Sequence, residues 1–216
     1  VLVTADATAT SETGLSANTQ YARKVQAYNA TGASTSAAVS RYTSIEAAAS
    51  ATYEGITETA ITIHSSNAPS SLDAGSSGIY FANTTNGTNS GWIQSNTWTS
   101  SSLTANTAYS FTITTRNGDG TLTATTNAGS QTTALVPTPP APSLFASTSE
   151  STTGLRYTWT DNSTSESGFR ILDGSDAIKV LVTADATATS ETGLSANTQY
   201  SRKVQAYNST GASTSA

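Results

Sequence analysis

The feature that most constrains this chain is a near-identical internal repeat. Residues 1–37 return as residues 180–216, with 35 of the 37 positions identical and both differences an exchange of Ala for Ser. Similarity of this degree indicates a duplication, and a fixed period is the sequence signature of repeat architectures. The sequence therefore predicts slightly more than one period of a tandem array whose period is 179 residues.

A second, weaker repeat lies inside this period. Leu-x5-Tyr occurs three times, and each Tyr is followed by Asn eight residues later and by Gly three residues after that. Successive copies begin 88 and 91 residues apart, so one structural unit has about 90 residues. The residues that form this pattern are Leu15, Leu103, Leu194, Tyr21, Tyr109, Tyr200, Asn29, Asn117, Asn208, Gly32, Gly120 and Gly211.

Between these positions, apolar and polar residues alternate. Tyr109, Phe111 and Ile113, for example, are separated by Ser110 and Thr112. This alternation indicates strands with one buried and one solvated face, and Thr suits the outward positions of a pleated surface. Turn sequences such as Asn86-Gly87 separate the apolar runs. Short strands at regular spacing, with no helical period, predict an all-β chain of sandwiches.

These residues carry a resemblance to a known family. Leu-x5-Tyr followed by alternating apolar residues and Asn-x-x-Gly resembles the E–F corner, strand F and F–G turn of fibronectin type III domains. Residues 159–169, from Trp159 to Phe169, resemble the B-strand tryptophan, B–C loop and C strand of bacterial members. The resemblance implies tandem fibronectin type III-like (immunoglobulin-like) β-sandwiches.

The same resemblance implies structural roles for the repeated residues. The three corner tyrosines are expected to bury their rings beside the corner leucines and to bond the backbone through their hydroxyls. The three asparagines should satisfy backbone groups where strand F ends, and the three glycines should take a positive φ in the turn. Trp159, Phe169 and Phe111 are expected in the cores.

The chain also departs from the family pattern. The middle unit has Ile61 and Ile63 where a B-strand Trp would stand, and Arg202 occupies a strand F position that is usually apolar. Two interpretations of Arg202 remain open. Its stem lies along the sheet with the guanidinium at the rim, or a local irregularity turns the side chain outward.

The corners also predict the domain limits. Residues 1–43 form the C-terminal half of one fibronectin type III domain, residues 44–135 form a complete domain, and residues 136–216 form a domain that lacks its last strand. Residues 136–179 and 1–43 together make one whole unit, so we expect these 216 residues to be an excerpt from a longer continuous polypeptide. The alternative is strand exchange between chains, which stoichiometry disfavours, because each chain supplies the later strands twice and the early strands once.

Composition excludes several functions. Ser and Thr make up 76 of the 216 residues, whereas only 11% are charged and the net charge is -5. Nine basic residues cannot neutralise a phosphate backbone, so nucleic acid is a poor partner. No apolar run reaches the 18 residues of a membrane span. Cysteine is absent, which removes disulfides, thiol nucleophiles and Cys-based metal sites.

No catalytic or metal-binding pattern emerges. The single histidine, His64, lies on the outward phase of a strand and is interpreted as a surface residue rather than part of a triad. The acids are scattered, and the loops 161–166 and 173–176 lack the spacing of an EF-hand. We therefore predict a protein that is not an enzyme and needs no cofactor or metal. Trp92 and Trp98 remain a candidate sugar-stacking platform.

The leading hypothesis is a structural repeat of a bacterial extracellular filament, stalk or surface layer. Its partners would be neighbouring repeats or subunits, because the stretches 97–102 and 121–126 carry none of the charges that guard sheet edges. The alternatives are a spacer module of a secreted polysaccharide-degrading enzyme and the stalk of an adhesin. Sequons make glycosylation plausible. They begin at Asn29, Asn83, Asn86, Asn162 and Asn208.

Overall fold

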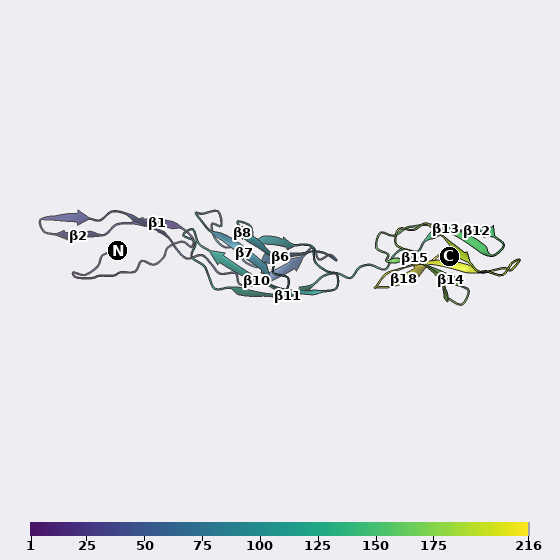
Figure 1. Ribbon diagram of the computed structural model, residues 1–216. Coiled ribbons are helices and arrows are strands. Elements are labelled where there is room, and N and C mark those ends of the chain that lie inside the picture. Colours follow the sequence, from purple (N-terminus) through teal and green to yellow (C-terminus); the bar gives the residue numbers. More distant parts are fainter. Residues whose placement is uncertain (216) are drawn as a thin grey trace. The chain divides into compact units, whose positions relative to one another are not determined.

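The computed structural model describes residues 1–215, which divide into two units, residues 1–134 and residues 135–215. All regular secondary structure in the described residues is β, from β1 to β18, with the strands of each unit visible in Figure 1. Nowhere in this part of the chain does a helix reach the length and apolarity needed to cross a membrane. The prediction of an all-β chain is confirmed.

The first unit contains a complete sandwich of seven strands. One sheet has the order β5-β6-β9 and the other the order β11-β10-β7-β8, with antiparallel neighbours throughout. The strands are β5 (Ala51–Glu54), β6 (Ile61–Ser65), β7 (Gly78–Asn83), β8 (Asn89–Ile93), β9 (Thr97–Ser100), β10 (Ala108–Arg116) and β11 (Thr126–Thr132). The Ala-rich stretch of residues 46–50, which precedes β5, is loop.

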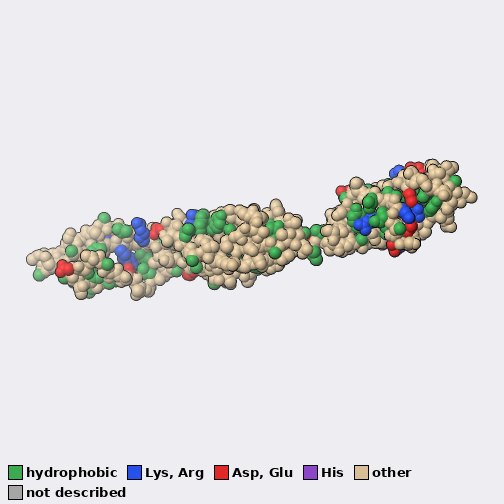
Figure 2. Space-filling model, turned by 60° about the horizontal axis from the view of Figure 1, so that its bottom comes forward, with side chains coloured by type: hydrophobic (Ala, Val, Ile, Leu, Met, Phe, Trp, Pro, Cys, Tyr) green, Lys and Arg blue, Asp and Glu red, His purple; other side chains and the backbone are tan. Residues whose placement is uncertain are grey.

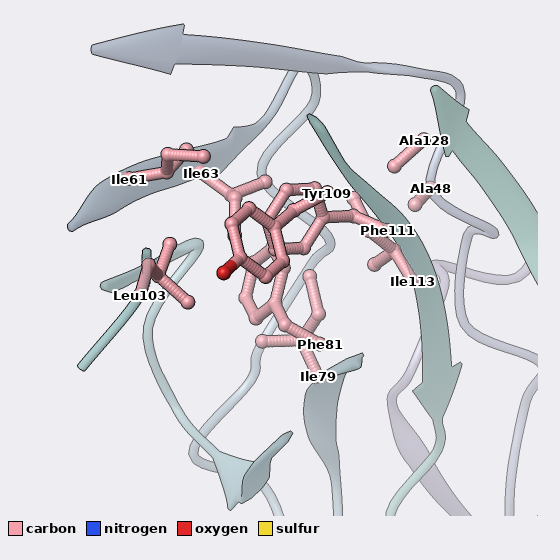
Figure 3. Packing of buried hydrophobic residues seen from close by; sticks show 10 residues of the cluster. All are labelled: Ala48, Ile61, Ile63, Ile79, Phe81, Leu103, Tyr109, Phe111, Ile113 and Ala128. Atoms are coloured by element: carbon pink, nitrogen blue, oxygen red, sulfur yellow. The ribbon is translucent and has the colours of Figure 1, made fainter. Parts of the chain in front are cut away.

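The core of this sandwich follows from the alternation along its strands. On β10, Tyr109, Phe111 and Ile113 point inward and are buried, while the residues between them face outward. Ile61 and Ile63 do the same from the opposite sheet, so they fill the space that a B-strand Trp would take. Figure 3 shows this packing, with the side chains of both sheets interdigitating.

The second unit repeats this architecture. Its sheets have the orders β12-β13-β16 and β15-β14-β17-β18. The strands are β12 (Ser143–Ser151), β13 (Gly154–Thr160), β14 (Gly168–Asp173), β15 (Ile178–Thr183), β16 (Ala188–Thr192), β17 (Arg202–Tyr207) and β18 (Ala212–Thr214). Trp159 and Phe169 lie in its core with ring centroids 5.3 Å apart.

The seven strands of each sandwich can be lettered A, B, C, C′, E, F and G in chain order, from β5 to β11 and from β12 to β18. Both sandwiches then have the order A-B-E in one sheet and C′-C-F-G in the other. The fold is therefore a tandem of fibronectin type III-like β-sandwiches. The prediction that residues 136–216 lack their last strand was wrong, because β18, a strand of three residues, pairs with β17 at the edge of the second sheet.

The first 43 residues form paired ribbons instead of a sandwich. The strands are β1 (Gln20–Arg23), β2 (Gln26–Asn29), β3 (Gly32–Thr35) and β4 (Val39–Tyr42). β1 pairs with β4, and β2 pairs with β3, so the segment is one interrupted hairpin. Few of its residues are buried. The segment belongs to the first unit together with the middle sandwich, so the predicted limit at residue 43 falls inside that unit.

Candidate inter-repeat interface

The corner tyrosines hold the turn that precedes strand F. Tyr109 is buried, and its hydroxyl accepts the Thr104 N–H at 2.8 Å; in Figure 3 this hydroxyl points to the side of Leu103. Tyr200 accepts the Ser195 N–H at 2.9 Å, and Tyr21 accepts the Ser16 N–H at 3.1 Å. All three hydroxyls therefore bond the backbone five residues earlier.

Burial of the three corners differs from the prediction. The Tyr109 ring and Leu103 are buried, whereas the rings of Tyr21 and Tyr200 and the side chains of Leu15 and Leu194 are only half-buried. In the second unit, β17 begins at Arg202, after Tyr200. The Tyr200 ring therefore lies at the end of the sheet, where a shallow pocket lined partly by Leu155, Leu194 and Tyr200 stays open. The expectation of three buried rings was wrong for these two.

The asparagines act as predicted in geometry, but two of the glycines do not. Asn29 and Asn208 each accept two backbone N–H groups through Oδ1, closing their turns. Gly120 has φ 82°, but Gly32 and Gly211 lie outside the positive-φ region, which corrects the prediction. The backbone hydrogen bonds across each turn explain why the turns differ.

In the two outer copies, Asn pairs directly with Gly across the hairpin. The middle turn is one residue longer, with Asn117 N–H donating to Thr121, so only Gly120 needs the left-handed conformation. Gly211 instead lies close to a neighbouring side chain. A Cβ there would come within 2.9 Å of Thr138 Oγ1.

The residue that joins the first corner to the middle sandwich is Asn18. Its side chain is fully buried, and its Nδ2 donates to the carbonyls of Ser70 and Ser71 at 2.9 and 2.7 Å. Its Oδ1 accepts the Gly118 N–H at 2.9 Å. Asn18 has φ 44°, which turns the side chain out of the corner toward the sandwich. One side chain thus binds both the B–C loop and the F–G turn of the next sandwich.

Further contacts surround this bond. The Tyr42 N–H donates to Asp119 Oδ2 at 2.9 Å, and Asn117 Nδ2 donates to the Thr43 carbonyl at 3.0 Å. A Cβ on Gly118 would lie 2.5 Å from the Tyr42 ring, so the ring packs directly on the Gly118 backbone. We call the contacts of Asn18, Tyr42, Asn117, Gly118 and Asp119 the joint. It connects the hairpin of residues 1–43 to the sandwich that follows.

The identical corner in the second copy, which contacts no further sandwich within residues 1–215, looks different. Asn197 occupies the place of Asn18 in the second copy and has nearly the same backbone angle, φ 52°. Its side chain is exposed, whereas that of Asn18 is buried. The burial of Asn18 therefore comes from the next sandwich and not from its own sequence. Sequence reasoning missed Asn18, although its presence in all three Leu-x5-Tyr motifs was a usable signal.

A buried ion pair crosses the second sandwich. Arg202 Nη2 lies 2.7 Å from Glu191 Oε1, and Tyr157 donates its hydroxyl to Glu191 Oε2 at 2.7 Å. The side chains of Arg202 and Glu191 are 8% and 9% exposed. The Arg202 guanidinium holds the pKa of Glu191 below its usual value, and burial raises the pKa of Tyr157. Neither interpretation of Arg202 from sequence was right, because its head is buried and paired.

The tryptophans do not form one platform. Trp98 on β9 stacks against Phe81 and packs on the core, whereas Trp92 on β8 belongs to the other sheet. Trp92 lies beneath Arg116, whose guanidinium carbon is 4.4 Å from the ring centroid. The candidate sugar platform made of both rings is therefore wrong.

The polar groups considered for chemistry are engaged in local structure. His64 lies between Thr97 Oγ1, 2.7 Å from Nδ1, and Glu54, 2.6 Å from Nε2. Asp173 accepts two backbone N–H groups and pairs with Lys179, which lowers its pKa to about 2. Glu166 accepts the Asp185 N–H at 3.1 Å. One carboxylate oxygen each from Asp161, Glu166 and Asp185 lies within 4.8 Å of the other two.

The outer surface carries few charges. Figure 2 shows one face dominated by uncharged polar side chains and backbone, with charged residues scattered singly or in small groups. The uncharged stretch 97–102 includes β9, an edge strand, and the stretch 121–126 leads into β11, another edge strand. Both stretches thus lie where a neighbouring sheet could pair.

Comparisons with known proteins do not assign this chain to a family. No protein-family model matches the chain. Chitinase A1 from Niallia circulans is 33% identical over 124 residues, which is 55% of this chain and 18% of the enzyme. The match thus spans less than a fifth of that enzyme's length.

Among solved structures, the chain is similar to the chicken CNTN1 FN1–FN3 domains, with 18% identity and a TM-score of 0.36, covering 91% of this chain and 72% of that one. It is also similar to a two-domain fibronectin type III segment of chicken tenascin, with 13% identity and a TM-score of 0.37. That match covers 78% of this chain and 95% of the tenascin segment.

Proposed function

We propose that this chain is a non-catalytic structural repeat of a bacterial extracellular filament, stalk or surface layer. Its layout is an alternating array, in which residues 1–43 complete one domain, 44–135 form the next and 136–216 open another. The partners are neighbouring repeats of the same polypeptide and adjacent subunits. The observation that carries the proposal is the joint, because it fixes one repeat to the next through a buried side chain.

A flexible tether between domains needs no such contact. Polar linkers leave their side chains in water and let the domains reorient. Here the Asn18 side chain makes three hydrogen bonds to two loops of the next sandwich, and Tyr42 packs on the backbone of one of them. Fixed geometry between successive repeats is what a filament or a stiff stalk requires.

The second candidate is a spacer module of a secreted polysaccharide-degrading enzyme. The observation that favours it is the 33% identity with part of chitinase A1. A spacer also gains from a stiff joint, because stiffness sets the distance between the modules at its ends. Both functions place the chain outside the cell, and neither assigns a catalytic residue to it.

Two measurements on the source organism separate these functions. The first is the intact mass of the native polypeptide, which should greatly exceed 22.0 kDa and fit further repeats of this sequence. The second is immunogold labelling of intact cells with antibody raised against this chain. Labelled filaments or a continuous surface coat support the structural array. If the antibody instead captures a soluble polypeptide that hydrolyses chitin, the result would support the enzyme spacer and contradict the structural array.

A further inference from the structure

Two nearly identical segments of this chain adopt different structures. Residues 180–183 and 188–192 lie in β15 and β16, whereas the matching residues 1–4 and 9–13 form no strand. The sequences of these stretches are the same, so the difference comes from what packs against them. In the second unit, β15 pairs with β14 and β16 pairs with β13, and both partners belong to the segment 136–179.

The apolar residues of strand F show the same contrast. Val204 is 0% exposed and contributes to the core, while its counterpart Val25 is 73% exposed. Tyr207 is half-buried beneath Arg170, whose guanidinium carbon lies 3.8 Å from the ring centroid. Its counterpart Tyr28 is exposed. Strand β17 pairs along its length with β14, which has no equivalent beside β1 and β2.

The same contrast between the two copies appears in polar groups, namely the ion pair and the asparagine of the turn. Glu12 and Arg23 form the same two-bond pair as Glu191 and Arg202, but with side chains 36% and 51% exposed. Asn208 Nδ2 donates to the carbonyls of Pro137 and Ser165 at 2.7 and 3.0 Å. Those acceptors belong to the segment 136–179, so every contrast points to that segment.

We propose that residues 1–35 are an acceptor surface for strands with the sequence of 136–179, supplied from the same polypeptide immediately ahead of Val1. The chain itself shows the fit, because residues 180–214 bind those strands with the same side chains. Supply by a second copy is disfavoured. A copy that lends its segment 136–179 uncovers its own residues 180–214, so one exposed surface is exchanged for another without gain in buried area. The inference rests on the proposed tandem arrangement.

The test compares three chains. The first is the 216-residue chain itself. The second carries an added copy of 136–179 ahead of Val1, so that Lys179 is followed by Val1 as it is naturally followed by Val180. The third is the second with Phe169→Asp and Ile171→Asp in the added copy only, since both of these residues are fully buried in the second unit. The readout is hydrogen exchange of the peptide 20–35, which Ala22 and Ala30 distinguish by mass from the peptide 199–214.

We expect exchange in residues 20–35 to slow by about 100-fold or more in the second chain and to stay fast in the third. Residues 199–214 serve as the internal reference and should stay protected in all three. The proposal would be overturned if residues 20–35 exchange as fast in the second chain as in the first while residues 199–214 stay protected from exchange. If the first chain already protects residues 20–35 and sediments as a dimer or larger species, a second copy is the source and the assignment to the same polypeptide is wrong. Neither result depends on whether the native protein is a filament or an enzyme spacer, which the cell labelling decides.

Discussion

The side chain of Asn18 and the backbone of Gly118 meet across a hundred residues of sequence, with the Gly118 N–H donating to Asn18 Oδ1 at 2.9 Å. This bond belongs to the joint, and the rest of the joint is arranged around it. Buried amide groups are costly to leave unpaired. Opening the joint would leave these amide groups unpaired and therefore costs free energy, which can be measured.

Replacing Asn18 with Ala should loosen the joint. The change removes three hydrogen bonds and leaves buried partners unpaired, at roughly 1–3 kcal/mol for the groups concerned. We expect faster exchange of the Gly118 amide and a lower melting temperature for the first unit. Asn197→Ala is the matched control, because its sequence context and left-handed backbone are the same and its side chain is exposed. Equal effects of the two substitutions would attribute the loss to backbone strain alone.

Replacing Tyr109 with Phe should destabilise the middle sandwich by roughly 1–3 kcal/mol, because the Thr104 N–H loses its acceptor next to a buried ring. The comparison is Tyr21→Phe, whose hydroxyl accepts a backbone N–H on an exposed corner. Thermal unfolding followed by near-ultraviolet circular dichroism measures both. If the Tyr109→Phe chain melts at the same temperature as the parent chain, the Tyr109 hydroxyl does not stabilise the corner.

Replacing Glu191 with Ala should destabilise the second unit strongly. Arg202 would remain buried without its partner, and breaking a buried pair in this way costs about 3–5 kcal/mol. Glu12→Ala removes the same residue from the same sequence at the exposed site, where water replaces the lost contact and we expect little change. Denaturant unfolding of both variants checks the prediction. Comparable losses at the two sites would mean that burial does not set the strength of this pair.

Acid should weaken the second unit. The pKa of Glu191 is held below its ordinary value of 4.5 by Arg202, and that of Asp173 is lowered to about 2 by Lys179 and two backbone N–H groups. A depressed folded-state pKa contributes stability above the unfolded pKa, and this contribution is lost as pH falls through the folded value. Melting curves between pH 6 and 2 should show the loss starting near pH 4.5, and Glu191→Gln should remove much of it. An unchanged pH profile in that variant would assign the acid sensitivity elsewhere.

Lateral association should depend on the uncharged edge at β9. Thr99 and Ser101 are exposed on this edge, and lysine there would place like charges opposite each other when two copies pair. We expect Thr99→Lys with Ser101→Lys to leave the fold intact and to abolish bundling in electron micrographs. Glu58→Lys, on an exposed loop outside the strands, controls for the change in net charge. Bundles that persist in the double variant would exclude this edge as the contact.

The strand pattern was accessible from sequence because alternation records burial directly. Phe111 and Trp159 were predicted as core residues for that reason, and both are buried. The joint was not accessible in the same way. Asn18 looks like a loop residue in isolation, and its partners at Ser70 and Gly118 lie far away in sequence. Only the fold brings the corner of one repeat onto the loops of the next.

The ion pair was missed for a related reason. Arg202 at an apolar position was noticed, but its partner Glu191 lies on another sheet, eleven residues earlier and across the corner. The glycine error has a local cause instead. Turn length, which the shared Asn-x-x-Gly pattern does not specify, decides whether the turn needs a left-handed residue. Gly120 has a positive φ in the longer middle turn, whereas no residue of the turns 29–32 and 208–211 does.

The contacts of Glu191 with Arg202 and Tyr157 tie strands from both sheets of one sandwich together without a covalent bond. A disulfide in that place would need an oxidant to form and would have to find its correct partner. The ion pair forms as soon as the two sheets close, and it separates without chemical damage when they are pulled apart. A thread made of such domains could be stretched until individual sandwiches open, and each would recover when the load is removed.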